Sequence, residues 1–271
     1  ADHISGLAEL RDKTKCITIM GEHAPADVVS MNVKDNEKIS IENIDLTALY
    51  TPGHTDDSYS FLMNDRVFTG DTLLIKGTGR TDFQNGNPYD QYHSLFNRLL
   101  KLPEETFIFP AHDYKGESVS TIGEEKNFNP RLQVNSAQEY ALIMNNLNLA
   151  NPKMMDIAVP ENKGLGFNRE KQKNLNGISY ERLKKISESE EVLLIDLREP
   201  IEIEKKPSLL NSINIPYSTL QEYFKNQKEL LKNKIIIFYC AVGERSAMAI
   251  QISQAYRFKK TYHLVGGINN L

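Results

Sequence analysis

Cysteine is scarce in this sequence of 271 residues, which contains Cys16 and Cys240 and no third. Two cysteines are too few for a disulfide scaffold, so we expect free thiols in a reducing compartment, with the cytoplasm as the default location. The sequence also lacks the run of about eighteen apolar residues that a membrane helix needs. We therefore expect no membrane partner.

An excess of charge of one sign is lacking too, because 32 Lys and Arg stand against 36 Asp and Glu, a formal net charge of -4. The charges are interspersed rather than gathered into a basic stripe, which argues against nucleic acid as a partner. Hydrophobic residues make up 40% and charged residues 25%, which is ordinary globular usage. The length is sufficient for two cores of common domain size, so two domains are expected.

The first part of the chain is predicted to be mostly sheet with added helices. Short β-rich segments at 16–20, 39–49, 59–63 and 66–69 are separated by Gly, Asp and Asn turns, and 106–110 reads as a buried strand. Apolar residues at helical spacing predict helices over 89–102 and 136–147, the second one capped by Ser136.

The second part of the chain alternates helices with strands. Helices are predicted at 180–186, 220–231 and 246–256, and strands at 192–197, 235–239 and 261–265. This alternation predicts a parallel sheet covered by helices. The polar, glycine-containing stretch 161–176 lacks hydrophobic periodicity and reads as a linker, so we place domains at 1–160 and 177–271.

Four separated segments of the first domain carry metal-ligating residue types at turns where strands end: Asp2 and His3, then His54 in PGHT, Asp71 in TGDT and His112 in PAHD. Loops at strand ends are where a rigid sheet can aim several side chains at one point. Each residue alone is better explained as a cap or a surface residue, but together they indicate a metal site.

The order and context of these segments resemble the metallo-β-lactamase superfamily, and within it the persulfide dioxygenases related to glyoxalase II. The resemblance covers about the first 160 residues and is carried by ADHISG, TPGHT, FTGDTLLIKGTGRTDFQ, FPAHDY, NPRL and MMDIAVPEN. It implies an αββα sandwich. It also places the family's HxH pair before Ala1, so the chain is expected to be truncated at its N-terminus.

The resemblance implies one ferrous iron, held by His54, Asp71 and the first His of the upstream HxH pair. Two His and one carboxylate form a facial set with open positions on which a persulfide and dioxygen can meet. Asp2, His3 and His112 match positions that bind a second metal in related hydrolases, and here we expect them to hold ligands and water. The implied reaction converts a thiol persulfide, dioxygen and water into the thiol and sulfite.

Two further residues of the first domain are candidates for binding the substrate. Arg80 could pair with a carboxylate of glutathione, and Tyr114 could hydrogen-bond its sulfur or backbone. The structural alternative for Arg80 is an ion pair with Asp82 that stabilises a turn. A zinc-dependent thioester hydrolase is the alternative enzyme for this domain, and metal content separates the two.

Cys240 of the second domain lies where a β-branched strand runs into an amphipathic helix, in the stretch IIIFYCAVGERSAMAIQI. Backbone N–H groups of such a loop and the helix N-terminus stabilise a thiolate and the persulfide it becomes. Gly243 permits the sharp path, Ser246 is a natural helix cap, and Arg245 can neutralise a sulfur oxyanion. Glu244 lowers the positive charge of the loop, which makes a dianion such as thiosulfate a less obvious donor.

CAVGERS resembles the CxxGxRS loop of rhodaneses, and IDLREP, SINIPYS and HLVGGI agree with that family over the last hundred or so residues. The resemblance implies a rhodanese-like α/β domain whose final helix is cut short at Leu271. It also implies a ping-pong cycle in which Cys240 takes a sulfane sulfur and passes it to sulfite or a thiol. A non-catalytic sulfur carrier or sensor is the alternative from another class. Homo-oligomer formation, the thiol carrier and the direction of sulfur flow stay open.

Four other residues could be mistaken for ligands, and we assign none of them a catalytic role. Cys16 lies in the apolar segment CITIM and is expected in the core. His93 is expected to be partly exposed on a helix, His23 to lie in a loop, and His263 to lie on the closing strand.

Overall fold

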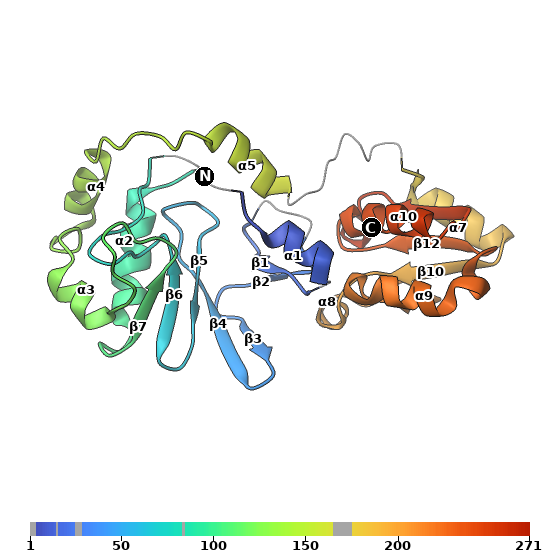
Figure 1. Cartoon of the computed structure of the whole chain (residues 1–271), viewed down its shortest axis with the longest axis horizontal. Helices are drawn as coiled ribbons and strands as arrows, with labels where there is room; N and C mark the ends of the chain where they lie inside the picture. The colour runs from blue at the N-terminus through green and yellow to red at the C-terminus, as the bar shows by residue number, and fades with distance from the viewer. Residues whose placement is uncertain (1–3, 15, 25–28, 83–84, 165–174) are drawn as a thin grey trace. The chain divides into compact units, whose positions relative to one another are not determined.

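The computed structural model describes residues 4–14, 16–24, 29–82, 85–164 and 175–271 (Figure 1). The chain divides into two compact units. One comprises Met20–Pro25 and Asn32–Asn151, and the other comprises Ala1–Ile19, Ala26–Met31 and Pro152–Leu271. Of the predicted metal residues, Asp2 and His3 lie outside the described part of the chain.

A six-stranded sheet forms the centre of the first-named unit. Its strands follow the order β3-β4-β5-β6-β7-β8, and all neighbours are antiparallel except the parallel pair β6 and β7. The strands are β3 (Lys38–Ile41), β4 (Ile44–Tyr50), β5 (Tyr59–Leu62), β6 (Arg66–Gly70), β7 (Phe107–Pro110) and β8 (Ser120–Thr121). The single strand predicted over 39–49 was wrong, because a turn with Glu42 at a positive φ of 52° splits it into a hairpin.

Helices pack on this sheet around one hydrophobic core. They are α2 (Pro88–Asn97), the short 3-10 helix η1 (Leu99–Lys101), α3 (Ile122–Phe128) and α4 (Ala137–Asn145), and Figure 1 shows α2 alongside β6 and β7. Leu95 and Leu99 pack with Val67 and Ile108 of the sheet. The predicted cap of α4 is confirmed, since Ser136 Oγ accepts a hydrogen bond from the Glu139 amide.

The segments around residues 7–33 carry the helix α1 (Leu7–Thr14) and the paired strands β1 (Ile19–Gly21) and β2 (Met31–Val33). The expectation that Cys16 belongs to the core was wrong, because β1 begins only at Ile19 and Cys16 is exposed ahead of it. His23 lies in a turn and is exposed, as expected.

The C-terminal part of the chain contains the predicted parallel sheet, which is confirmed with the order β11-β10-β12-β13-β9. Its strands are β9 (Gly177–Ile178), β10 (Val192–Asp196), β11 (Ser212–Asn214), β12 (Ile235–Tyr239) and β13 (Lys260–Leu264). Helix α5 (Met155–Gly164) extends into the stretch predicted as a linker, and residues 165–174 of that stretch lie outside the described residues. His263 lies on β13, as expected.

Helices cover both faces of the parallel sheet, as the alternating pattern predicted. Helix α7 (Tyr180–Ser189) packs Leu183 against strand residues such as Ile237. On the other face, α9 (Leu220–Leu231) and α10 (Glu244–Ala255) contact each other, and Phe224 packs on Phe238 with ring centroids 5.9 Å apart. The remaining elements are α8 (Pro200–Lys205) and the 3-10 helices η2 (Tyr217–Thr219) and η3 (Ile268–Asn270).

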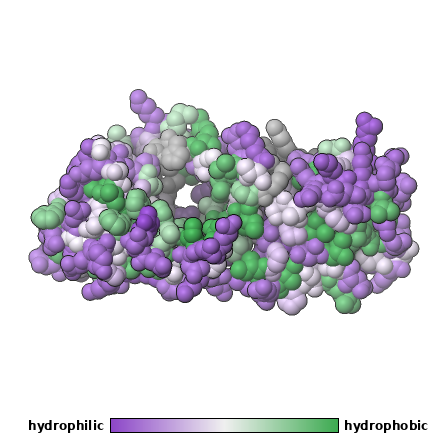
Figure 2. All heavy atoms as spheres, turned by 60° about the horizontal axis from the view of Figure 1, so that its bottom comes forward, coloured by the Kyte–Doolittle hydropathy of each residue, from purple (hydrophilic) through white to green (hydrophobic). Residues whose placement is uncertain are grey.

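Hydrophilic side chains are spread over the face shown in Figure 2, with smaller groups of hydrophobic residues between them. Within the described ranges, none of the helices combines the length and the apolar character that a membrane crossing requires.

Candidate functional site

Three loops of the six-stranded sheet end at the same edge, and each carries one predicted metal residue. His54 follows β4, Asp71 follows β6 directly, and His112 follows β7. Strands β4, β6 and β7 run in the same direction, because β5 is antiparallel to both of its neighbours and β7 is parallel to β6. Their C-terminal ends therefore meet at one edge, where a hydrogen bond from the Ala111 amide to the Gly70 carbonyl ties two of the loops together.

The side chains of these three residues converge on Asp71. His112 Nδ1 lies 2.7 Å from Asp71 Oδ1, and His54 Nε2 lies 3.6 Å from Asp71 Oδ2. All three side chains are partly open to solvent, with exposed fractions of 18% for His54, 21% for Asp71 and 24% for His112. Each carboxylate oxygen thus faces a different imidazole.

His54 and Asp71 offer an imidazole nitrogen and a carboxylate oxygen, donor atoms that ligate divalent transition metals. His54 Nδ1 lies 2.7 Å from the Arg80 carbonyl oxygen, so that nitrogen donates and Nε2 is left as the ligating atom. His112 takes up Asp71 Oδ1 and leaves Oδ2 for a metal. Among the residues that the structure describes, no group of three or more His, Cys, Asp or Glu side chains is placed to hold a metal ion. The described pair therefore fits two of the three ligands that the sequence predicted.

Gly79 and Gln91 support this site, and the sequence analysis missed both. A Cβ on Gly79 would lie 2.9 Å from His54 Nδ1 and 2.1 Å from the Asp71 carbonyl oxygen, so the backbone at 79 packs directly against both ligand residues. The fully buried Gln91 of α2 donates from Nε2 to the carbonyls of Gly79 and Thr72. The position of Gly79 within the matched stretch FTGDTLLIKGTGRTDFQ was the available signal for such a close approach.

Tyr140 of α4 completes the buried support. Its hydroxyl lies 2.7 Å from Gln91 Oε1 and 3.0 Å from Thr78 Oγ1. The α2 side also holds the His54 loop, because Ser94 Oγ donates to the Pro52 carbonyl. A buried polar network of this kind is rigid when every member is paired. The loops that carry His54 and Asp71 are thus positioned from one helix.

The two predicted substrate-binding residues differ in their surroundings. Arg80 makes the ion pair with Asp82 at 2.6 Å, and its guanidinium also donates to the carbonyls of Ala150 and Leu149. Tyr114 is 78% exposed, and its ring stacks beside that of His112 with centroids 6.0 Å apart. The Arg80 guanidinium is therefore already bonded to other groups of the protein, whereas Tyr114 lies at the surface beside His112.

Cys240 occupies the turn between β12 and α10, as predicted, and it is fully buried. The Gly243 amide donates to Cys240 Sγ at 3.2 Å. Gly243 has a φ of 97°, a conformation that favours glycine, and it is the N-cap of α10. The expectation that Ser246 caps this helix was wrong, because Ser246 lies inside the first turn and donates to the Gly243 carbonyl.

Strand β13 and the residues after it contact the Cys240 loop. The Ile268 amide donates to the Cys240 carbonyl at 2.9 Å, and a Cβ on Gly267 would lie 2.5 Å from that oxygen. Ser246 Oγ lies 3.8 Å from Cys240 Sγ and 3.4 Å from His263 Nδ1. Burial lowers the pKa of His263, so the imidazole beneath the loop is neutral near pH 7.

Arg245 is buried and forms a two-pronged ion pair with Glu202 of α8. Its Nη1 and Nη2 donate to the Glu202 carboxylate at 2.8 and 2.7 Å. Burial by itself lowers the pKa of Arg245, but the hydrogen bonds with Glu202 and the surrounding negative charges raise it above its ordinary value. The sequence patterns did not single out Glu202 as a site residue. It belongs to the stretch EPIE, which forms the capping box of α8 in the structure.

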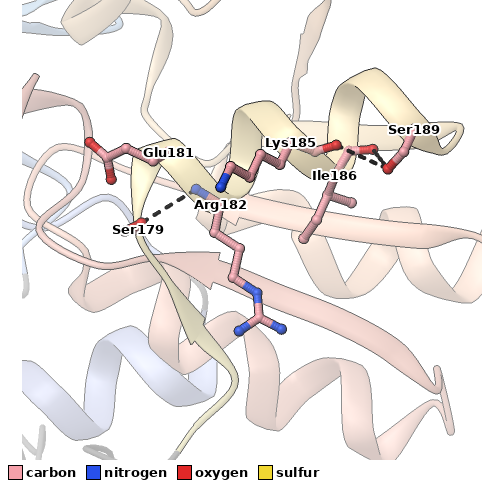
Figure 3. A pocket seen from close by; sticks show the side chains of 6 residues that line it. All are labelled: Ser179, Glu181, Arg182, Lys185, Ile186 and Ser189. Atoms are coloured by element: carbon pink, nitrogen blue, oxygen red, sulfur yellow. Dashed lines mark hydrogen bonds between the residues drawn. The ribbon is translucent and has the colours of Figure 1, made fainter.

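A surface hollow of about 480 Å³ lies along α7, and none of the predicted site residues lines it. Figure 3 shows its lining residues, which come from that helix and its cap: Ser179, Glu181, Arg182, Lys185, Ile186 and Ser189. The hollow therefore adds nothing to either candidate site.

Comparison with known proteins assigns the two parts of the chain to two different families. The model of the metallo-beta-lactamase superfamily matches residues 1–112, and that of the rhodanese-like domain matches residues 179–271. The mitochondrial persulfide dioxygenase ETHE1 of Homo sapiens is 41% identical over 169 residues, which are 61% of this chain and 66% of that protein. The chain thus spans just under two thirds of the length of this relative.

Solved structures agree with these matches. The crystal structure of ETHE1 from Myxococcus xanthus is 46% identical with a TM-score of 0.60, and the match covers 61% of this chain and 73% of that one. A metallo-beta-lactamase from Staphylococcus aureus subsp. aureus COL is 22% identical with a TM-score of 0.54, covering 96% of this chain and 80% of that one. The second likeness shows the fold alone.

Proposed function

Because this chain belongs to the persulfide dioxygenase family of the metallo-beta-lactamase superfamily and continues into a rhodanese-like domain, we propose that it couples persulfide oxidation to sulfane-sulfur transfer. In the first reaction a thiol persulfide, dioxygen and water give the thiol and sulfite. In the second, Cys240 accepts a sulfane sulfur and passes it to sulfite or to a thiol. The expected cytoplasmic location stays a prediction.

The observation that carries the oxidation site is the convergence of His54 and His112 on the two oxygens of Asp71. In the proposal, His54 Nε2 and Asp71 Oδ2 provide two of the protein ligands of one ferrous ion. Ferrous iron, when bound, supplies the one-electron chemistry that dioxygen and a persulfide require and that zinc lacks.

The protein's own residues orient the ligands and the substrate. The Arg80 carbonyl sets the tautomer of His54, and His112 fixes the rotation of the Asp71 carboxylate. In the proposal Tyr114, which is exposed beside His112, donates a hydrogen bond to a glutathione-type persulfide. Arg80 is already paired with Asp82, so a direct bond to a substrate carboxylate would require that ion pair to rearrange.

The observation that carries the transfer site is the hydrogen bond from the Gly243 amide to Cys240 Sγ. The Cys240 thiolate attacks the outer sulfur of a donor, a new S–S bond forms at Sγ, and the donor's own S–S bond breaks with the electron pair leaving on the rest of the donor, which for a thiol persulfide is the thiolate. The loop amides and the N-terminus of α10 stabilise the resulting persulfide. Sulfite then removes the outer sulfur as thiosulfate, which restores the thiolate.

Mass spectrometry of the chain after incubation with glutathione persulfide tests the transfer site. We expect one added sulfur atom on the Cys240 peptide, removed again by sulfite or cyanide. Cys240→Ser abolishes this addition because a hydroxyl forms no persulfide, whereas the matched control Cys16→Ser leaves it unchanged. Sulfur found on Cys16, or transfer by the Cys240→Ser protein, would refute the assignment.

Anaerobic titration with ferrous iron tests the oxidation site. His54→Ala and Asp71→Ala should each lower iron affinity and persulfide-dependent oxygen uptake, while His93→Ala, on an exposed face of α2, should change neither. A chain extended by an HxH segment ahead of Ala1 should bind iron more tightly. Retention of oxygen uptake by either variant would refute the ligand assignment, whereas a requirement for zinc without oxygen uptake would favour the hydrolase.

A further inference from the structure

The charge next to Cys240 is set by a residue outside the cysteine loop. Arg245 is 4% exposed, and both of its terminal nitrogens are taken up by Glu202, whose side chain is 15% exposed. A two-pronged guanidinium–carboxylate pair cancels most of the net charge that either group projects. The single arginine of the loop is therefore neutralised within the fold before any donor arrives.

Further carboxylates surround this ion pair. Glu199, 3% exposed, accepts a hydrogen bond from Ser218 Oγ, and Glu244 precedes Arg245 in the loop and is also buried. Burial raises the pKa of Glu199, although the hydrogen bond from Ser218 and the charge of Arg245 oppose that rise. Arg245 thus has three acidic neighbours, which are Glu199, Glu202 and Glu244. Buried charges act on one another through a low dielectric, so these carboxylates offset the positive charge of Arg245.

We propose that Glu202 is a specificity-determining residue, which disfavours dianionic sulfur donors at Cys240 and leaves donors of lower charge, such as thiol persulfides, as the preferred class. The inference rests on the sulfur-transfer function proposed above and names its donor class. This donor class is consistent with the first domain, because a thiol persulfide is also the substrate of that domain's proposed reaction.

Two sulfur donors with similar structures but different charges distinguish the effect of donor charge from the effect of donor shape. Thiosulfate is a dianion and methanethiosulfonate is a monoanion, and both carry the sulfane sulfur on a sulfonyl sulfur. In each case the Cys240 thiolate forms a bond to the sulfane sulfur while the bond to the sulfonyl sulfur breaks. The electron pair leaves as sulfite from thiosulfate and as methanesulfinate from methanethiosulfonate, so neither reaction needs an added oxidant or reductant.

The test is Glu202→Gln in the whole chain. Glutamine removes the charge but keeps an oxygen that can accept the hydrogen bond from the Glu199 amide, which Glu202 Oε2 accepts at 2.8 Å. We expect the ratio of kcat/KM for thiosulfate to kcat/KM for methanethiosulfonate to rise on the order of tenfold, because the uncompensated Arg245 attracts the second negative charge. The matched control Glu204→Gln, on the same helix and exposed, should leave the ratio unchanged.

The outcomes distinguish this inference from the function on which it rests. If the unmodified chain forms no persulfide on Cys240 with any donor, the transfer function itself fails. If it does, and Glu202→Gln keeps its melting temperature with an unchanged ratio, the specificity role is refuted. If Glu202→Gln unfolds, Glu202→Asp is measured instead; it keeps the charge, so a tenfold rise in that variant would also contradict the charge argument.

Discussion

Replacement of Gly79 by Ala isolates the contact between the backbone and the metal residues. An added Cβ would lie 2.1 Å from the Asp71 carbonyl oxygen and 2.9 Å from His54 Nδ1. The Gly79 amide also donates to that same carbonyl at 2.8 Å, so the two segments have no room to slide apart without losing this hydrogen bond. The methyl group must therefore displace His54, Asp71 or both.

The size of the displacement follows from ordinary contact distances. Non-bonded heavy atoms rest at about 3.5 Å, so relief of the contact requires a shift of roughly 1 Å or more. Overpacking of this kind costs about 1–3 kcal/mol in the free energy of unfolding. Loss of the orientation of ligand residues typically costs 10-fold to about 100-fold in metal affinity, and we expect Gly79→Ala to fall in that range.

Gly77→Ala is the matched control in the same loop, because its Cβ would meet nothing closer than 3.9 Å. Neither Gly77 nor Gly79 is among the glycines with positive φ, so the backbone of both positions accepts alanine. Ferrous iron titration and denaturant unfolding of both variants provide the assay. Equal iron affinity and equal unfolding free energy for Gly79→Ala and Gly77→Ala would refute the packing argument.

Two further predictions concern buried groups. Tyr140→Phe should lower the free energy of unfolding by about 1–3 kcal/mol in a denaturant titration, because Gln91 Oε1 loses its hydrogen-bond donor inside the core; an unchanged midpoint would contradict this. For His263, burial lowers the folded-state pKa below 6.5, so the unfolded state binds protons first and stability falls as pH drops through 6.5. His263→Gln should flatten this slope in thermal unfolding between pH 7 and about pH 5, and an unaltered slope would exclude His263 as its source.

The sequence alone determined those features that depend on local periodicity and on short motifs. The helix at 220–231 and the strand at 235–239 were predicted with the bounds that the structure has, because a helical apolar period and a β-branched run are unambiguous over those lengths. The positions of His54, Asp71 and His112 at strand ends followed from turn residues next to apolar strands. The family resemblance supplied their expected roles.

Local turn geometry was less predictable than the periodic elements. A single residue, Glu42, adopts a positive φ and divides the strand predicted over 39–49, although its residue type gives no sign of it. Cys16 lies in an apolar segment and is still exposed, because the strand β1 begins three residues later. The helix begins at Glu244, with Gly243 rather than Ser246 as its N-cap, and this likewise depends on a backbone conformation that the sequence permits without requiring.

Only the tertiary structure decided which side chains support the two sites. Arg245 and Glu202 are separated by 43 residues and meet because β10 and β12 lie side by side in the parallel sheet. Gln91 reaches the Gly79 carbonyl because α2 packs over the loops at the sheet edge. Local sequence patterns indicate helices, strands and reactive residues. The pairing of buried charges, and the contact of a glycine with a metal-ligating residue, depend on strand register and on packing between distant segments.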